Sequence, residues 1–257
     1  MSQRSAGSGA RRRRPGRSQV ILDDDEPDVS SQPSSSQVQR ARCSFTPQQI
    51  EQKVAEVVQF ILIKDQKKIP IRRADVVKHV VKEYKGQYPG IIRRAGQTFE
   101  QVFGLNLVEI DSKNHVYILV NKLHPLPGEP ISMCPGSPKT GLLFVILSLI
   151  FMKGGTVKEI LVWNTLKKLR VYEGVKHEEF GDVKKLVTDV FVRQKYLEYV
   201  RIPHTEPLEH EFRWGARAEQ EVSKMKLLQF IGELHNEEPQ TWTQQYREAA
   251  SVESNPR

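Results

Sequence analysis

Cysteine is nearly absent from this sequence, and long apolar runs are absent as well. Only two cysteines occur among the 257 residues, Cys43 and Cys134, and no CxxC spacing is present. The sequence therefore indicates neither a disulfide framework nor a zinc site, and it fits a reducing compartment. The longest apolar run, residues 142–152, is too short to span a bilayer, and no apolar stretch suggests a signal peptide. We therefore expect an intracellular protein without a membrane partner.

The sequence motifs of common enzyme classes are missing too. It contains no HExxH, no GxSxG, no phosphate-binding Walker loop and no GxGxxG followed by an acidic residue. His177 is the only histidine with close acidic neighbours, Glu178 and Glu179. Such a group is more typical of a solvated loop than of a ligand set. We expect no catalytic residue, no metal site and no cofactor.

What the sequence has in excess is positive charge. Lysine and arginine number 39 against 31 aspartates and glutamates, which gives a net charge of +8. This excess favours contact with nucleic acid or another acidic surface. Many soluble proteins are equally basic without such a partner, so charge alone does not decide between the two.

The first 46 residues differ in composition from the rest. They are rich in Ser, Gly, Pro, Gln and Arg and have almost no aromatic residues, so we expect them to be disordered. Arg11–Arg14 with Arg17 form a basic cluster, which is typical of a nuclear-import signal, of a phosphate-binding tail or of a solvated tail.

A short apolar triplet in this tail is followed at once by acidic residues. Its members and the first acids are Val20, Ile21, Leu22, Asp23 and Asp24. The pattern resembles a SUMO-interacting motif, which adds a strand to the edge of SUMO's sheet while its acids meet a basic rim. The motif is short enough to arise by chance.

From Thr46 the apolar residues recur at helical spacing. Three helices are expected, the first ending near Asp65, the second containing residues 77–84 and the third residues 92–103. Gly104 ends the third helix, and two strands are expected at residues 105–110 and 116–120. Three helices followed by a hairpin is the order of a winged helix. We assign this module to residues 47–124.

A second module of the same order follows a linker at residues 125–138. Its expected elements are helices at 141–152, 157–169 and 182–194 and a hairpin at 196–202 and 208–214, with Leu208, His210, Phe212 and Trp214 on one face. A closing helix follows, so the second module covers residues 139–250 and residues 251–257 form a disordered end. The expected fold class is mainly α with small β-hairpins (α+β), built from tandem winged-helix modules.

Basic and polar residues gather around the expected third helices. A winged helix often binds DNA by laying this helix in the major groove. The candidate DNA-binding residues are Arg72, Arg73, Arg93, Arg94, Gln97, Lys184, Lys185, Arg193 and Lys195. Glutamates in the second wing (Glu198, Glu206, Glu209 and Glu211) would repel phosphate, which argues against sequence-specific readout with the help of this wing. Basic residues elsewhere would then bind the DNA backbone with little sequence preference. A solvated helix face is the alternative reading.

Two apolar segments point to protein docking. Residues 142–152 are apolar almost all round, so this helix needs a second cover, from the first module or from a partner chain. In the first helix the apolar stripe centres on Ile61, with Leu62 at its edge and Ile63 facing away.

Four segments of the sequence are similar to segments of a known protein family and occur in the same order along the chain. They are FILIKDQKKIP from Phe60, VFGLNLVEID from Val102, PKTGLLFVIL from Pro138 and KYLEYVRIPHTEPLEHEFRWG from Lys195. Together they resemble the MAGE (melanoma-antigen) homology domain over roughly residues 47–250. The sequence departs from the family pattern at Ile61, where leucine is usual, and at Ala216, where proline is usual. Among family members, QFILIKDQKKIPI, LIFMKGG and VRQKYLEYVRIPHTEP are most similar to the non-SMC element subunits of the SMC five/six complex.

The resemblance implies a fold and a set of partners. The fold is a tandem winged helix, in agreement with the pattern above. The partners are a RING-type ubiquitin ligase subunit at Ile61 and Leu62, with Ile63 as a further candidate, and a kleisin subunit at the second module, at Leu143, Leu147 and Phe151. The SMC five/six heterodimer and double-stranded DNA complete the expected set, in the nucleus on chromatin, with a role in DNA repair.

The implied function is that of a non-catalytic subunit that bridges the RING and kleisin subunits and enhances ligase activity. The alternative is a MAGE-type ligase adaptor that selects substrates outside chromatin. A free-standing winged-helix transcription factor lacks support, because the wing is not suited to reading bases.

Overall fold

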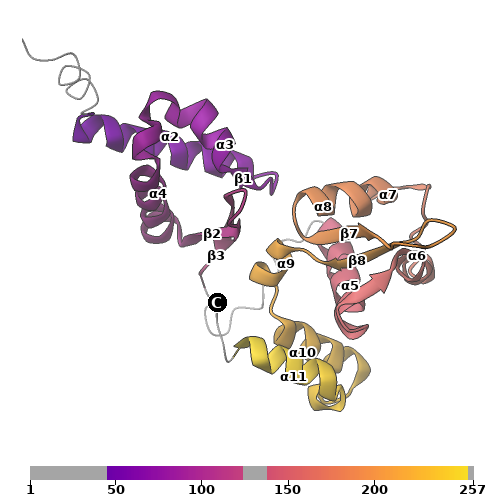
Figure 1. Cartoon of the computed structure of the whole chain (residues 1–257). Helices are drawn as coiled ribbons and strands as arrows, with labels where there is room; N and C mark the ends of the chain where they lie inside the picture. The colour runs from indigo at the N-terminus through magenta and orange to yellow at the C-terminus, as the bar shows by residue number, and fades with distance from the viewer. Residues whose placement is uncertain (1–44, 124–137, 254–257) are drawn as a thin grey trace, which may run out of the picture. The chain divides into compact units, whose positions relative to one another are not determined.

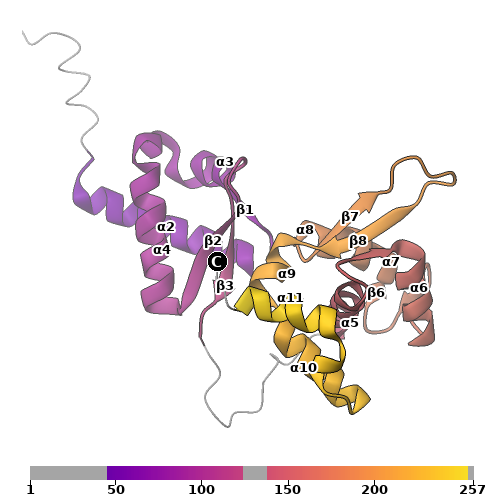
Figure 2. The ribbon, with the colours of Figure 1, turned by 60° about the horizontal axis from the view of Figure 1, so that its bottom comes forward.

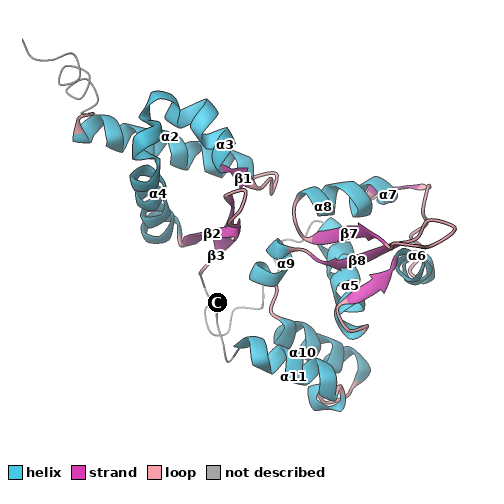
Figure 3. Cartoon of the chain, in the orientation of Figure 1, coloured by secondary structure: helices cyan, strands magenta, loops and turns pink. Residues whose placement is uncertain are grey.

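The computed structural model describes residues 45–123 and 138–253, which include two modules of helices followed by a small sheet (Figure 1, Figure 3). The expected SUMO-interacting residues 20–24, the basic cluster at residues 11–17, Cys43 and Cys134 lie outside the described residues. No helix in the described part is long and apolar enough to cross a membrane.

The first module has three helical regions and a three-stranded antiparallel sheet of order β1-β3-β2. Its elements are α2 (Pro47–Asp65), β1 (Ile71–Arg72), α3 (Arg73–Val76), the π-helical η1 (Val77–Val81), the 3₁₀-helical η2 (Lys82–Gln87), α4 (Tyr88–Phe103), β2 (Leu105–Asp111) and β3 (Val116–Asn121).

The ends of α2 and α4 follow from local chemistry. Thr46 caps α2: its hydroxyl accepts a hydrogen bond from the Gln49 amide at 3.2 Å, and the Gln49 side chain accepts one from the Thr46 amide at 2.9 Å. This reciprocal pair satisfies amides that the first helical turn leaves open. Gly104 ends α4 in the left-handed conformation, at φ 63°, which glycine adopts at little cost.

Apolar faces of α2, α3, η1 and α4 enclose the core of the first module. Val57, Ile61, Ile91 and Phe99 are fully buried in it, and Leu119 from β3 closes the sheet side. The core positions recur at helical spacing, as the sequence pattern predicts.

The second module repeats the arrangement and adds helices at its end. Its elements are α5 (Pro138–Met152), β4 (Thr156–Lys158), α6 (Glu159–Lys168), β5 (Lys176–His177), β6 (Gly181–Asp182), α7 (Val183–Lys185), the π-helical η3 (Leu186–Val190), α8 (Phe191–Arg193), β7 (Leu197–Arg201), β8 (His210–Trp214), α9 (Ala216–Glu221), α10 (Lys224–His235), η4 (Pro239–Thr241) and α11 (Thr243–Glu253).

The apolar helix α5 is covered within its own module. Leu227, Leu228 and Ile231 of α10 and Ala249 of α11 belong to the same core as α5, and Figure 2 shows these two helices beside it. The indole N–H of Trp214 donates to the Leu147 carbonyl at 2.9 Å. The apolar pattern predicted a cover from the first module or from a partner chain, whereas β8, α10 and α11 of the same module contribute it.

The expected α+β class and the order of helices and hairpins are confirmed, with several local differences. Residues 156–158 form strand β4 rather than the start of a helix, because Val157 pairs with Phe212 of β8. Strand β1, helix α9 and the small β5–β6 hairpin were not predicted. Helix α11 extends to Glu253, so residues 251–253 are helical and not part of a disordered end. Leu208 lies before β8 and is exposed, so it does not share the buried face of Phe212 and Trp214.

Gly215 allows the hairpin to close onto the segment where it began. The Gly215 amide donates to the Tyr196 carbonyl at 2.8 Å, and the Arg217 amide donates to the Lys195 carbonyl at 2.9 Å. A Cβ atom at position 215 would lie 2.3 Å from the Lys195 carbonyl oxygen. Only glycine fits this approach, and the contact fixes where α9 begins.

Candidate functional site

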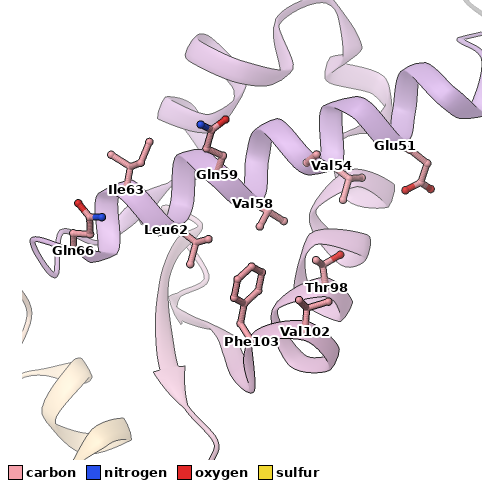
Figure 4. Close-up of a pocket in the computed structure, with 11 residues that line it drawn as sticks. Glu51, Val54, Val58, Gln59, Leu62, Ile63, Gln66, Thr98, Val102 and Phe103 are labelled. Atoms are coloured by element: carbon pink, nitrogen blue, oxygen red, sulfur yellow. The ribbon is translucent and has the colours of Figure 1, made fainter. Parts of the chain in front are cut away.

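An apolar groove runs between α2 and α4 of the first module (Figure 4). Its volume is about 520 Å³. Figure 4 shows Val58 and Leu62 of α2 turned toward Phe103 of α4. Val102 and Phe103, at the last turn of α4, are 69% and 40% exposed. Large apolar side chains that stay open to solvent in a groove are typical of a protein-docking surface.

The three candidate partner-binding residues of α2 occupy three different environments. Ile61 is fully buried in the core. Leu62 is partly buried and lines the groove, and Ile63 is 57% exposed at the groove's edge. This burial agrees with the helical pattern, in which Ile61 is the centre of the stripe and Leu62 its edge. Among the three, Leu62 and Ile63 are accessible to a partner.

Polar side chains surround the apolar floor of the groove. Glu51, Gln59 and Gln66 of α2 and Thr98 of α4 contribute to its lining. Glu51 forms an ion pair with Arg94, which links the two helices at one end of the groove. An apolar centre with a polar rim is the usual composition of a protein interface.

Val102 and Phe103 are the groove residues that the sequence analysis missed. Their spacing from Phe99 continues the helical apolar pattern of the third helix, and this pattern alone predicts that they are core. The buried positions of α4 are instead Tyr88, Ile91, Ala95 and Phe99. The available signal was the pair of adjacent large apolar residues directly before the helix-ending Gly104.

The candidate kleisin-binding residues are part of the core. Leu143, Leu147 and Phe151 are all buried, in one core with residues of β8, α10 and α11. A docking surface cannot consist of these side chains in the described arrangement. An exposed apolar face lies next to them: Phe230 and Leu234 of α10 are 43% and 66% exposed, and the Phe230 ring packs edge-on against Phe144 of α5, at 5.3 Å between centroids.

All nine candidate DNA-binding residues are exposed. In the first module Arg93, Arg94 and Gln97 are exposed positions of α4, whose buried positions include Ile91 and Ala95. Arg94 pairs with Glu51. Arg72 and Arg73 lie at the start of α3, where the Arg73 guanidinium stacks 4.9 Å from the centre of the Tyr88 ring.

The basic residues of the second module stand among acidic ones. Lys184 binds Glu173 at 2.8 Å, and this hydrogen bond raises the pKa of Lys184. Arg193 binds Asp189 at 2.8 Å. Lys184 and Lys185 also line a hollow of about 570 Å³ beside the β5–β6 hairpin, together with Asp182 and Asp189. The carboxylates lower the positive potential there, so a phosphate group would have to displace or outcompete them.

The described residues contain no group of three or more His, Cys, Asp or Glu side chains placed to hold a metal ion.

The model of the MAGE homology domain matches residues 57–225, which is well over half of the chain. The chain belongs to the MAGE homology domain family. This agrees with the resemblance of the four sequence segments and with the tandem winged-helix fold.

Several members of the MAGE family are highly similar to this chain. It is 52% identical over 208 residues to the human "Non-structural maintenance of chromosomes element 3 homolog", which covers 80% of this chain and 68% of the human protein. It is 48% identical over 198 residues to human "Melanoma-associated antigen D2", which covers 77% of this chain but 33% of that protein. Among solved structures, a chain of the "Nse1-Nse3-Nse4 complex" matches with a TM-score of 0.76 and 55% identity, covering 80% of this chain and all of that one.

Proposed function

We propose that this MAGE protein is a non-catalytic subunit of the SMC five/six chromosome-maintenance complex that bridges a RING-type ubiquitin ligase subunit and a kleisin subunit. The observation that carries the proposal is the likeness, over that chain's whole length, to a chain of the Nse1-Nse3-Nse4 complex. Nse1 corresponds to the RING-type subunit and Nse4 to the kleisin. By binding both, the chain would enhance ligase activity without catalysing a reaction itself.

The groove between α2 and α4 is the proposed docking surface for the RING-type subunit. Leu62, Val102 and Phe103 offer apolar area that no other described residue covers fully. A partner that inserts apolar side chains there would remove this area from water, which is the main source of affinity at the centre of an interface. Ile61 would contribute indirectly, by holding α2 in place from the core.

Val102→Glu tests this surface. Because Val102 is exposed in the free protein, the substitution should leave folding intact, while a carboxylate buried by the partner should weaken binding on the order of tenfold or more. The measurement is isothermal titration of the purified RING-type subunit into each variant. Gln101→Glu is the matched control: it adds the same charge to a neighbouring exposed position of α4 that does not line the groove. Equal affinity of both variants would exclude the groove.

The proposed kleisin surface lies on the second module at the exposed face of α10. Phe230 and Leu234 are open to solvent there, next to the partly buried Phe144. This face replaces Leu143, Leu147 and Phe151, whose burial leaves them the indirect role of supporting α5.

We also propose that the chain binds double-stranded DNA with little sequence preference. The support is the exposure of basic side chains along α4 and around α7 and α8. The second wing presents Glu198 and Glu206 to solvent, so it is poorly suited to contact phosphates.

Replacing both Arg93 and Arg94 with glutamate should weaken DNA binding and reduce its salt dependence. Each lost phosphate contact removes about 0.9 from the slope of log K against log salt concentration. Fluorescence anisotropy with a labelled duplex at several salt concentrations measures the slope. Lys226→Glu with Arg247→Glu is the control, because it makes the same charge change on the exposed surface of α10 and α11. An unchanged slope in the Arg93/Arg94 variant would show that these residues of α4 do not contact DNA. The same measurement with Lys184 and Lys185 replaced by glutamate then shows whether the second module contacts DNA.

The alternative function, a ligase adaptor that selects substrates outside chromatin, is kept open by the identity to melanoma-associated antigen D2. Affinity purification of the full chain followed by mass spectrometry separates the two. Recovery of SMC and kleisin chains supports the proposed function, and their absence alongside a RING-type ligase supports the alternative. Binding of SUMO by the tail remains a prediction from the sequence.

A further inference from the structure

Arg217 is the only buried charged residue among residues 45–123 and 138–252, with an exposed fraction of 0%. It belongs to α9 of the second module, yet several of its contacts are with the first module. Burying a guanidinium is unfavourable unless its N–H groups are hydrogen-bonded and its charge is paired. The contacts that offset this cost therefore define what the residue holds together.

Three contacts reach the first module. The Nη2 group donates to the Lys68 carbonyl at 3.2 Å, and Nη1 donates to the Leu119 carbonyl of β3 at 3.4 Å. Nη1 also lies 3.7 Å from Oδ1 of Asp65, the last residue of α2. This carboxylate oxygen is buried and accepts no hydrogen bond from the described residues, so the guanidinium compensates its charge through space.

The remaining contacts stay in the second module. Nε donates to the Gln194 carbonyl at 2.9 Å, and Nη1 donates to Oε1 of Glu221 at 2.9 Å. The Tyr196 hydroxyl donates to the other oxygen of Glu221 at 2.6 Å. Burial and the charge of Glu221 raise the pKa of Tyr196, which keeps this phenol a donor. Glu221 is thereby fixed from two sides and holds Arg217 in one orientation.

A neighbouring contact reaches the same segment of the first module. The Gln194 side-chain amide donates to the Lys67 carbonyl at 3.2 Å. Residues 65–68, the last residue of α2 and the turn that follows it, are thus the common target of two side chains of the second module. These residues follow Leu62 and Ile63 in the chain, at the end of the helix that forms one wall of the groove.

We propose that Arg217 is a positioning residue whose diverging N–H groups hold the second winged-helix module against residues 65–68 and β3 of the first. Guanidinium chemistry is required, because a planar fork with five donors can reach carbonyls in several directions whereas lysine directs its donors from one point. The inference goes beyond the proposed function, since it depends on no particular partner. It has a consequence for any groove ligand: a ligand that displaces the end of α2 also displaces the acceptors of Arg217, which couples the groove to the second module.

The distribution of distances between the two modules tests the proposal in the full chain. Spin labels are placed at Gln97→Cys on α4 and Gln229→Cys on α10, both exposed, after Cys43 and Cys134 are replaced by serine. Double electron–electron resonance should give one narrow peak with Arg217 present. In Arg217→Met, which keeps an unbranched side chain but removes the charge and donors, the narrow peak should be lost.

Arg217→Lys separates charge from geometry, and Arg213→Met is the control. Lysine keeps the positive charge, so the fold of each module should persist by circular dichroism while the distance distribution still broadens. Arg213 is exposed and pairs with Glu211 of its own strand, so Arg213→Met should leave the narrow peak unchanged. A narrow peak in Arg217→Lys would overturn the proposal, as would one in a folded Arg217→Met. If Arg217→Met does not fold, the lysine variant decides.

Discussion

Ile61→Ala should lower the free energy of unfolding by about 2–5 kcal/mol, because truncating a fully buried isoleucine removes apolar contacts and leaves a cavity. Ile61 packs between α2 and the rest of the first-module core with no solvent exposure. Urea denaturation of the full chain, followed by circular dichroism, measures the change.

Ile63→Ala is the matched control for this prediction. It makes the same chemical change two residues further along α2, at a position that is 57% exposed. Its effect on unfolding should stay within about 0.5 kcal/mol. Equal destabilisation by both variants would contradict the division of α2 into a core side and an accessible side.

Phe151→Ala should lower the free energy of unfolding at least as much as Ile61→Ala does, by about 3–5 kcal/mol. The Phe151 ring is buried and lies 6.3 Å from the Trp214 ring, centroid to centroid. Trp214 in turn binds the Leu147 carbonyl, so the phenylalanine supports the contact between α5 and β8. The same denaturation experiment applies.

Phe230→Ala serves as the comparison, because it removes the same side chain from an exposed place on the same module. Its main ring contact is the edge-on pair with Phe144, and such a pair contributes about 0.5–1.5 kcal/mol. A Phe151→Ala variant that retained full stability while losing the kleisin would contradict the core assignment and restore the interpretation drawn from the sequence.

The sequence was sufficient to predict the helices and hairpins because their signals are local. Helical spacing placed α2 and α4, Gly104 marked the end of α4, and alternation in residues 196–214 marked the second hairpin. The same signals predicted that Ile61 is core. The start of α6 was wrong because Thr156–Lys158 pair with β8, which lies more than fifty residues later in the chain, and no local pattern reports such a pairing.

The candidate surfaces were harder to predict, because exposure depends on what covers each face. Leu143, Leu147 and Phe151 looked available since α5 is apolar almost all round, but they are buried in a core shared with β8, α10 and α11. Val102 and Phe103 looked like core because they continue the stripe of α4, but they are only partly covered and line the groove. Arg217 has no sequence signal at all, since its acceptors are mostly main-chain carbonyls from distant segments.

Reconstitution of the three-chain complex tests the bridging role most directly. The purified full chain is mixed with the RING-type and kleisin subunits, and the mixture is separated by gel filtration. We expect the RING-type subunit and the kleisin to co-elute only when this chain is present. Val102→Glu should lose the RING-type subunit alone, and Leu234→Glu should lose the kleisin alone. Co-elution of the two partners without this chain, or loss of neither partner in these variants, would contradict the account.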